Sequence, residues 1–159
     1  YASFGRLCDN IVLNRSDKVV IPVPLPLASI TELRWLSYRS LEPGQSRHAL
    51  SPSSKPKKKM DRYQQRVLAM RLDDLVSVFD LPRPNHMKVD VDGAELEVLQ
   101  GAEQVLSDSS LETIMVEVDH TLTDAISGIL AAHRFTLESR HQRDKAGKQA
   151  RSWYGLFRR

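Results

Sequence analysis

The sequence predicts an α/β fold with one mostly parallel sheet that closes in a C-terminal antiparallel hairpin. Short apolar runs with the two-residue period of a strand alternate with longer stretches that have the period of a helix. Carboxylates stand where a strand passes into a helix, which is where α/β sheets bind their ligands. The chain has 159 residues, 41% of them hydrophobic, which suits a single domain over 1–159.

The first 70 residues are expected to hold one helix, short strands and a loop. Apolar residues recur at helical spacing over 3–13. The ranges 33–38 and 67–70 each predict a short strand. The range 42–61 is rich in Ser, Pro and Lys and offers little to bury, so it predicts a flexible loop.

Three prolines stand at alternate positions in the apolar stretch 19–27. In a strand, Pro22, Pro24 and Pro26 would remove hydrogen-bond donors from one edge and leave the other edge intact. The stretch is therefore an edge strand or no strand at all.

The rest of the chain predicts a regular succession of strands and helices. Asp73 or Asp74 is expected to cap a helix over 75–79. The ranges that follow are strand 86–91, helix 94–106, strand 112–118, helix 122–133, strand 135–140, a polar loop containing Gly147, and strand 152–158.

Charge is unevenly distributed, although the formal net charge is only +3. The range 73–124 holds 13 acidic residues and two basic ones, whereas 140–159 holds seven basic residues and one acidic. Residues 55–59 include four lysines, but no aromatic residues interleave with them to stack bases, so nucleic acid is not the expected partner. One alternative is a non-catalytic binding domain that engages acidic partners through this basic loop and tail.

Cysteine content and apolar runs bear on the cellular setting. Cys8 is the single cysteine, which excludes an internal disulfide and a cysteine-based metal site. The longest apolar stretch, 19–30, is interrupted by prolines and is too short to span a bilayer. The N-terminus lacks the pattern of a signal peptide. We expect a cytoplasmic protein without a membrane partner.

The segment 87–102, with the sequence MKVDVDGAELEVLQGA, carries the strongest functional pattern. Asp90 lies inside the expected strand, either as a ligand-binding carboxylate or as the ion-pair partner of Lys88. Asp92 and Glu95 have the spacing of a capping box, and a helix N-terminus at the end of a strand is also where a ligand binds.

A second polar group ends the next expected strand. Glu117, Asp119 and His120 should lie near Asp90, because the carboxyl ends of adjacent parallel strands share one edge of the sheet. The cluster could act by proton transfer or could hold a divalent cation through its oxygens. His120 alone could equally be a surface or capping residue.

Several of these segments together resemble the FkbM-type methyltransferases, in the correct order and over nearly the whole chain. The matching residues are Leu72-Asp73-Asp74-Leu75, Lys88, Asp90, Asp92, Gly93, Ala94, Glu95, Val98, Leu99, Gly101 and Ala102. Further similar segments are Leu7 to Asn14, Ser40 to Ser46, Ile114 to Val118 and Trp153 to Phe157.

This resemblance implies a Rossmann-like methyltransferase sheet, S-adenosylmethionine as cofactor, and a hydroxyl on a sugar or secondary metabolite as acceptor. The motif match and the expected clustering of acids at strand ends together predict cofactor-binding roles for four residues and catalytic roles for three. The cofactor-binding residues are Ala28, Ser29, Asp90 and Glu117, and the catalytic residues are Asp92, Glu95 and His120, with Asp92 or His120 as the base. No metal ligand is assigned.

Two features depart from the family pattern. The Gly-rich loop after the family's first strand and the acid after its second would precede Tyr1, so the chain is expected to carry about two thirds of a catalytic domain. Ser29 stands where the family usually has an acid. Strands left without their neighbours would expose sheet edges, through which the chain could associate with itself.

Overall fold

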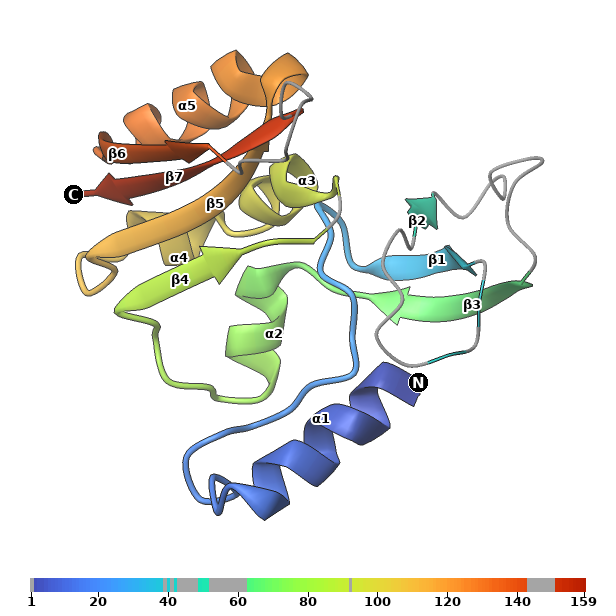
Figure 1. Cartoon of the computed structure of the whole chain (residues 1–159). Coiled ribbons are helices and arrows are strands. Elements are labelled where there is room, and N and C mark those ends of the chain that lie inside the picture. Colours follow the sequence, from blue (N-terminus) through green and yellow to red (C-terminus); the bar gives the residue numbers. More distant parts are fainter. Residues whose placement is uncertain are drawn as a thin grey trace. The chain divides into compact units, whose positions relative to one another are not determined.

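The computed structural model describes residues 2–38, 40, 42, 49–51, 63–91, 93–142 and 151–159 (Figure 1). Most of the expected loop 42–61, the polar loop with Gly147, and Asp92 lie outside these ranges. The described chain divides into two compact units, each of which is considered by itself. Unit 1 comprises Tyr1–Pro26 and Glu32–Ala69, and unit 2 comprises Leu27–Thr31 and Met70–Arg159.

Over its described residues, unit 1 contains one helix and a three-stranded antiparallel sheet. Helix α1 spans Ala2–Leu13, as the sequence predicts. Strands β1 (Glu32–Tyr38), β2 (Ala49–Ser51) and β3 (Tyr63–Ala69) pair in the order β2-β1-β3. Cross-strand contacts support the pairing: the Arg66 guanidinium lies 5.2 Å from the centre of the Trp35 ring, and Tyr38 stacks on Tyr63.

For this half the structure decides one open alternative and corrects two expectations. Residues 19–26 form no strand, and a single parallel bridge joins Leu27 to Met70, so the no-strand alternative holds. The alternate prolines explain this, because the N–H groups that they lack cannot enter a ladder. Strand β2 lies within the range expected to be only loop, and β3 begins at Tyr63, four residues before the expected start.

Unit 2 is built on a four-stranded sheet with helices between its strands. Its strands are β4 (His86–Val89), β5 (Thr113–Asp119), β6 (Thr136–Gln142) and β7 (Ser152–Arg158), in the order β4-β5-β7-β6. Strands β4 and β5 are parallel, and β7 is antiparallel to both β5 and β6. Three strands therefore share one direction and a hairpin closes the sheet, which is consistent with a Rossmann-like methyltransferase fold.

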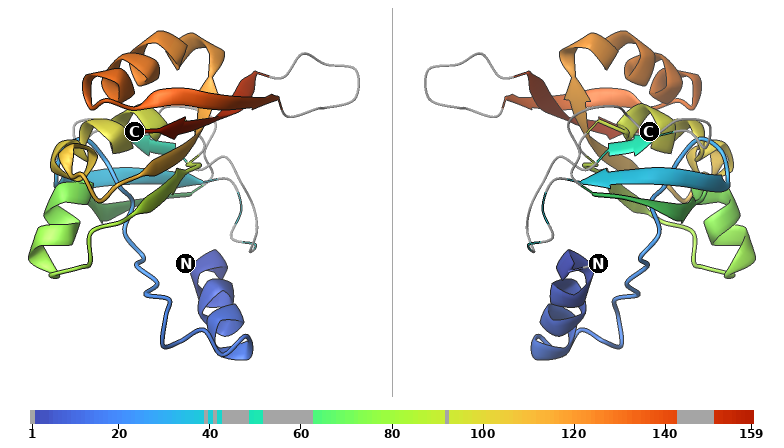
Figure 2. Two further views of the ribbon diagram at one scale, coloured as in Figure 1. Left: turned by 90° about the vertical axis from the view of Figure 1, so that its left-hand side faces the viewer. Right: turned by 90° about the vertical axis from the view of Figure 1, so that its right-hand side faces the viewer.

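The helices of unit 2 are short. They are α2 (Leu72–Val78), α3 (Glu95–Gln100), α4 (Glu103–Ser107), the 3₁₀ turn η1 (His120–Leu122) and α5 (Thr123–Ala132). Figure 2 shows α5 lying over one face of the sheet. Alternate residues of the central strands point toward this side, where Ile114, Val116 and Val118 are fully buried. Trp153 of β7 joins the same core.

The single helix expected over 94–106 is instead two helices that meet at Gly101 and Ala102. A Cβ atom added to Gly101 would lie 2.1 Å from the carbonyl oxygen of Ala28, so the chain can pass there only without a side chain. The cap predicted for 75–79 is also wrong. Helix α2 begins at Leu72 after Arg71, which makes no side-chain cap, and the Asp73 carboxylate serves another helix, as described below.

Candidate active site

The carboxyl ends of β4 and β5 bring two acidic side chains together. Val89 pairs with Val116, so Asp90, directly after β4, comes next to Glu117 of β5. Tyr154, which lies opposite Glu117 on β7, also reaches Asp90 with its hydroxyl, so both acids lie on the same side of the sheet. The sequence-based expectation that these two strand ends meet is therefore fulfilled for Asp90 and Glu117.

Three further side chains complete a strand-end cluster on this side of the sheet. Lys88 Nζ lies 3.0 Å from Asp90 Oδ2, and the Tyr154 hydroxyl donates to the same oxygen at 3.3 Å. The Ser152 hydroxyl donates to Glu117 Oε1 at 2.5 Å. Strand β7 supplies Ser152 and Tyr154 because it lies beside β5, with Tyr154 opposite Glu117. The strand-end cluster thus consists of Lys88, Asp90, Glu117, Ser152 and Tyr154.

Electrostatics in the strand-end cluster favour an ionised Asp90. Partial burial raises the pKa of Asp90, but hydrogen bonds with Lys88, Glu117 and Tyr154 outweigh this effect, and the pKa lies below its ordinary value. The hydrogen bond and charge of Asp90 in turn raise the pKa of Lys88. The cluster therefore presents a fixed carboxylate, an ammonium group and hydroxyls, a set suited to binding polar groups of a small molecule.

Glu95 holds the loop between β4 and α3. Its side chain is 3% exposed, and its Oε1 accepts hydrogen bonds from the backbone N–H groups of Val91 and Gly93, each at 3.1 Å. Gly93 has φ of +102°, which only glycine adopts readily. The predicted capping box placed the helix cap at Asp92, whereas α3 has Ala94 as its N-cap residue without a side-chain bond. Asp92 itself lies outside the described residues.

Asp119 and His120 form the turn that follows β5. The Asp119 carboxylate accepts hydrogen bonds from the Thr121 N–H at 2.8 Å and the Thr121 hydroxyl at 2.6 Å, and these bonds lower the pKa of Asp119. His120 is exposed, and its backbone N–H donates to the carbonyl of Arg151. Asp119 is thus explained as a capping residue, and His120 lies within three positions of Glu117 along the chain.

Ala28 and Ser29 lie in the short segment 27–31 of unit 2. Ala28 is fully buried, and its N–H donates to the carbonyl of Met70 at 2.9 Å. Ser29 is half-buried and follows directly. Of these two, Ser29 is the one whose side chain is partly exposed.

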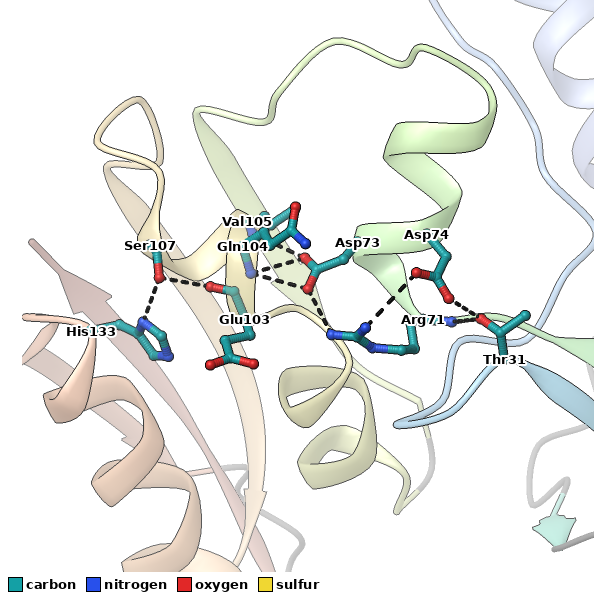
Figure 3. A network of polar contacts seen from close by, with 9 residues as sticks. All are labelled: Thr31, Arg71, Asp73, Asp74, Glu103, Gln104, Val105, Ser107 and His133. Atoms are coloured by element: carbon teal, nitrogen blue, oxygen red, sulfur yellow. Dashed lines mark hydrogen bonds and ion pairs between the residues drawn. The ribbon is translucent and has the colours of Figure 1, made fainter.

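A second polar network in unit 2 centres on Asp73, whose side chain is 1% exposed (Figure 3). Its carboxylate accepts from the N–H groups of Gln104 and Val105 at 3.0–3.1 Å, at the start of α4. The Arg71 guanidinium donates to it at 3.0 Å and lies 3.8 Å from Asp74. Asp73 therefore caps a helix about 30 residues farther along the chain.

Thr31 ties the segment 27–31 into the same network. The Thr31 hydroxyl accepts from the backbone N–H of Arg71 at 3.0 Å and donates to the carboxylate of Asp74 (Figure 3). We call Thr31, Arg71, Asp73 and Asp74, with the amides of Gln104 and Val105, the Asp73 hub. Sequence reasoning recognised the two acids but assigned them to the adjacent helix. The sequence did offer one signal of a link to α4: both acids belong, together with Gly101 and Ala102, to the residue pattern that resembles the FkbM-type methyltransferases.

Within the described ranges, no group of three or more His, Cys, Asp and Glu side chains is arranged to hold a metal ion. Over the same ranges, no helix has the length and apolar character needed to cross a membrane.

Comparison with known proteins gives the family. The model of the methyltransferase FkbM domain matches residues 21–144, which is most of the chain. The chain belongs to this family, and at family level it is a methyltransferase. Searches of curated proteins and of solved structures returned no match.

Proposed function

We propose that the chain is an S-adenosylmethionine-dependent O-methyltransferase whose acceptor is a hydroxyl on a sugar or a secondary metabolite. Family membership supports methyl transfer and this cofactor. The register that places Asp90 beside Glu117 at adjacent parallel strand ends is the observation on which we rest the position of the site.

The residues around this edge fit the chemistry of the cofactor. S-adenosylmethionine carries cationic groups and ribose hydroxyls, which carboxylates bind well, and when bound it supplies an electrophilic methyl group. In the proposal Asp90, Glu117 and Ser29 bind the cofactor, with buried Ala28 shaping the segment that presents Ser29. Lys88 keeps Asp90 oriented through their 3.0 Å ion pair.

Proton transfer from the acceptor is assigned to the loop and turn that flank the strand-end cluster. An acceptor hydroxyl must lose its proton as it is methylated, and a positioned carboxylate or imidazole can take it. We assign this role to Asp92 or His120. Glu95 contributes by holding the backbone on both sides of Asp92, through the N–H groups of Val91 and Gly93.

Calorimetric titration of the 159-residue chain with S-adenosylmethionine and with its demethylated product tests the cofactor assignment. We expect saturable binding of one equivalent, and weaker binding by Asp90→Asn and Glu117→Gln. Glu138→Gln is the matched control, because Glu138 forms an exposed ion pair with Arg158 in the same sheet. Absence of binding by a folded chain, or equal binding by all three variants, contradicts the proposal.

A methyl-transfer assay against a panel of hydroxylated acceptors, read by mass spectrometry, tests the reaction. Asp92→Asn and His120→Gln should each be compared with the parent chain at several pH values. If one variant no longer shows the fall in activity on the acid side of the pH profile, the residue changed in it is the base. Full turnover and an unchanged pH profile in the double variant contradicts the assigned roles.

A further inference from the structure

Hydrogen bonds and a β-bridge hold the segment 27–31 in unit 2 at both of its ends. At the first end Leu27 bridges Met70, and the N–H of Ala28 donates to the Met70 carbonyl. At the other end the Thr31 hydroxyl bonds the backbone N–H of Arg71 and the carboxylate of Asp74. Ser29 lies between these two anchor points, so its position depends on both of them.

The Asp73 hub continues from Thr31 to α4. Arg71 contacts Thr31 through its backbone and Asp73 through its guanidinium. Asp73 in turn binds the first N–H groups of α4, and its own N–H donates to the carbonyl of Gly101 at 3.1 Å. A buried carboxylate with several charge-assisted hydrogen bonds has one favoured position, which makes this connection rigid.

Helix α3 completes the path to the strand-end cluster. Gly101 ends α3 and approaches the Ala28 carbonyl so closely that no side chain fits between them. Glu95 begins α3 and binds the loop after Asp90 through two backbone N–H groups. The segment with Ser29 and the loop after β4 are thus fixed to one support that consists of α3, α4 and Asp73.

We propose that Thr31, Arg71 and Asp73 are positioning residues: they hold the segment 27–31 at a fixed place relative to the loop that follows β4. This inference rests on the proposed function for the roles of Ser29 and Asp90. None of the three positioning residues needs to touch the cofactor or the acceptor. Thr31 is the most useful one to test, because its side chain is exposed and its loss leaves no cavity in the core.

The experiment compares the parent chain with Thr31→Val, Thr31→Ser and Thr136→Val. Valine keeps the shape of threonine without the hydroxyl, whereas serine keeps the hydroxyl. Thr136 is the matched control, because its exposed hydroxyl bonds a backbone carbonyl, that of Arg158, in the far edge of the sheet. Binding of the demethylated cofactor is measured by calorimetry, and the urea midpoint is measured on the same samples.

We expect Thr31→Val to weaken binding by about five- to tenfold, the order of effect of one or two lost hydrogen bonds, with little change in the urea midpoint. Thr31→Ser should restore binding, and Thr136→Val should leave it unchanged. Equal binding by Thr31→Val, or failure of Thr31→Ser to restore it, overturns the proposal. A parallel fall in binding and urea midpoint also overturns it, because that pattern is the one expected of a residue that only stabilises the fold.

Amide hydrogen exchange separates this proposal from the proposed function. If the parent chain binds no cofactor, the proposed function fails for this chain, and the positioning role is decided by exchange alone. Thr31→Val should then speed exchange of the Ala28 amide at least about fivefold and leave that of Val105 unchanged. Equal protection of the Ala28 amide in the parent and in Thr31→Val overturns the proposal.

Discussion

Two carboxylates of unit 2, Asp73 and Asp90, belong to the same family pattern yet have opposite surroundings. Asp73 is nearly fully buried, and its oxygens are bound by backbone amides of α4 and by Arg71. Asp90 has a side chain that is 34% exposed, and its partners are the ends of side chains, Lys88 and Tyr154. The comparison teaches that membership in a motif does not fix what a carboxylate contacts: Asp73 binds backbone amides and a guanidinium, whereas Asp90 binds the ends of two side chains.

The largest effect is expected for Asp73→Ala. The variant leaves two amides of α4 and the Arg71 guanidinium without their acceptor in a buried place, which should lower the free energy of unfolding by about 3 kcal/mol. Urea denaturation measures it. Asp108→Ala, at a carboxylate that is 28% exposed and paired with the exposed Arg83, is the control and should change stability far less. A loss below about 1 kcal/mol for Asp73→Ala would mean that the hub is not a structural support.

Gly101→Ala should have the next largest effect. The added Cβ would meet the Ala28 carbonyl at 2.1 Å, so the backbone must shift, at a cost of about 1–3 kcal/mol in the free energy of unfolding. Gly128→Ala is a control of opposite sign. Gly128 lies within α5 with open space around it, and alanine should stabilise that helix by up to about 1 kcal/mol. Equal stability of the two variants would refute the close approach.

Glu95→Gln should lower the free energy of unfolding less than Gly101→Ala does. Its main effect should be faster amide exchange in the loop between β4 and α3. The neutral amide accepts the Val91 and Gly93 hydrogen bonds more weakly, which should cost about 1 kcal/mol. Amide exchange at Gly93 should be faster than in the parent chain. Glu103→Gln, an exposed residue of α4, serves as the control. Unchanged exchange at the Gly93 amide would mean that the Glu95 carboxylate does not hold this loop in place.

The smallest effect on stability is expected at the ion pair of Asp90 and Lys88, and it should depend on pH. The lowered pKa of Asp90 means that the pair stabilises the fold above the ordinary carboxyl value of 3.8 and that this stabilisation is lost as pH falls through the lower, folded pKa. The raised pKa of Lys88 preserves the pair beyond 10.5, and the stabilisation is lost as pH rises through the folded value.

The free energies of unfolding of the parent chain and of Asp90→Asn should therefore differ slightly at pH 7 and become equal in strong acid. Added salt should shrink the difference at pH 7, because exposed pairs are screened. Cofactor affinity, by contrast, should fall markedly in Asp90→Asn. If Asp90→Asn lost stability but kept its affinity for the cofactor, Asp90 would be a structural residue like Asp73, and the contrast between the two carboxylates would be wrong.

Much of unit 2 could be predicted from periodicity alone. The limits of β5, α5 and β7 fall within two residues of the expected ranges, because each has a strong apolar pattern that meets a single core. The approach of β4 and β5, and with it the placement of Asp90 beside Glu117, followed from the alternation of strands and helices.

Long-range contacts account for what the sequence did not reveal. The break between α3 and α4 depends on the Ala28 carbonyl, more than 70 positions away, and the role of Asp73 depends on amides about 30 positions away. Local rules assign an acid to the nearest helix start, so they misplace a cap that serves another helix. The prolines of 19–27 indicate that one edge of this stretch lacks hydrogen-bond donors. Whether the stretch still pairs with another strand depends on that strand, which the sequence does not identify.

The two tryptophans of the chain lie one in each unit, Trp35 half-buried in β1 and Trp153 at 1% exposure in β7. This division gives each unit its own optical probe. In Trp35→Phe the fluorescence reports only the surroundings of Trp153, and in Trp153→Phe only those of Trp35. Whether the two units melt together or separately can thus be read from two emission curves recorded on otherwise identical chains.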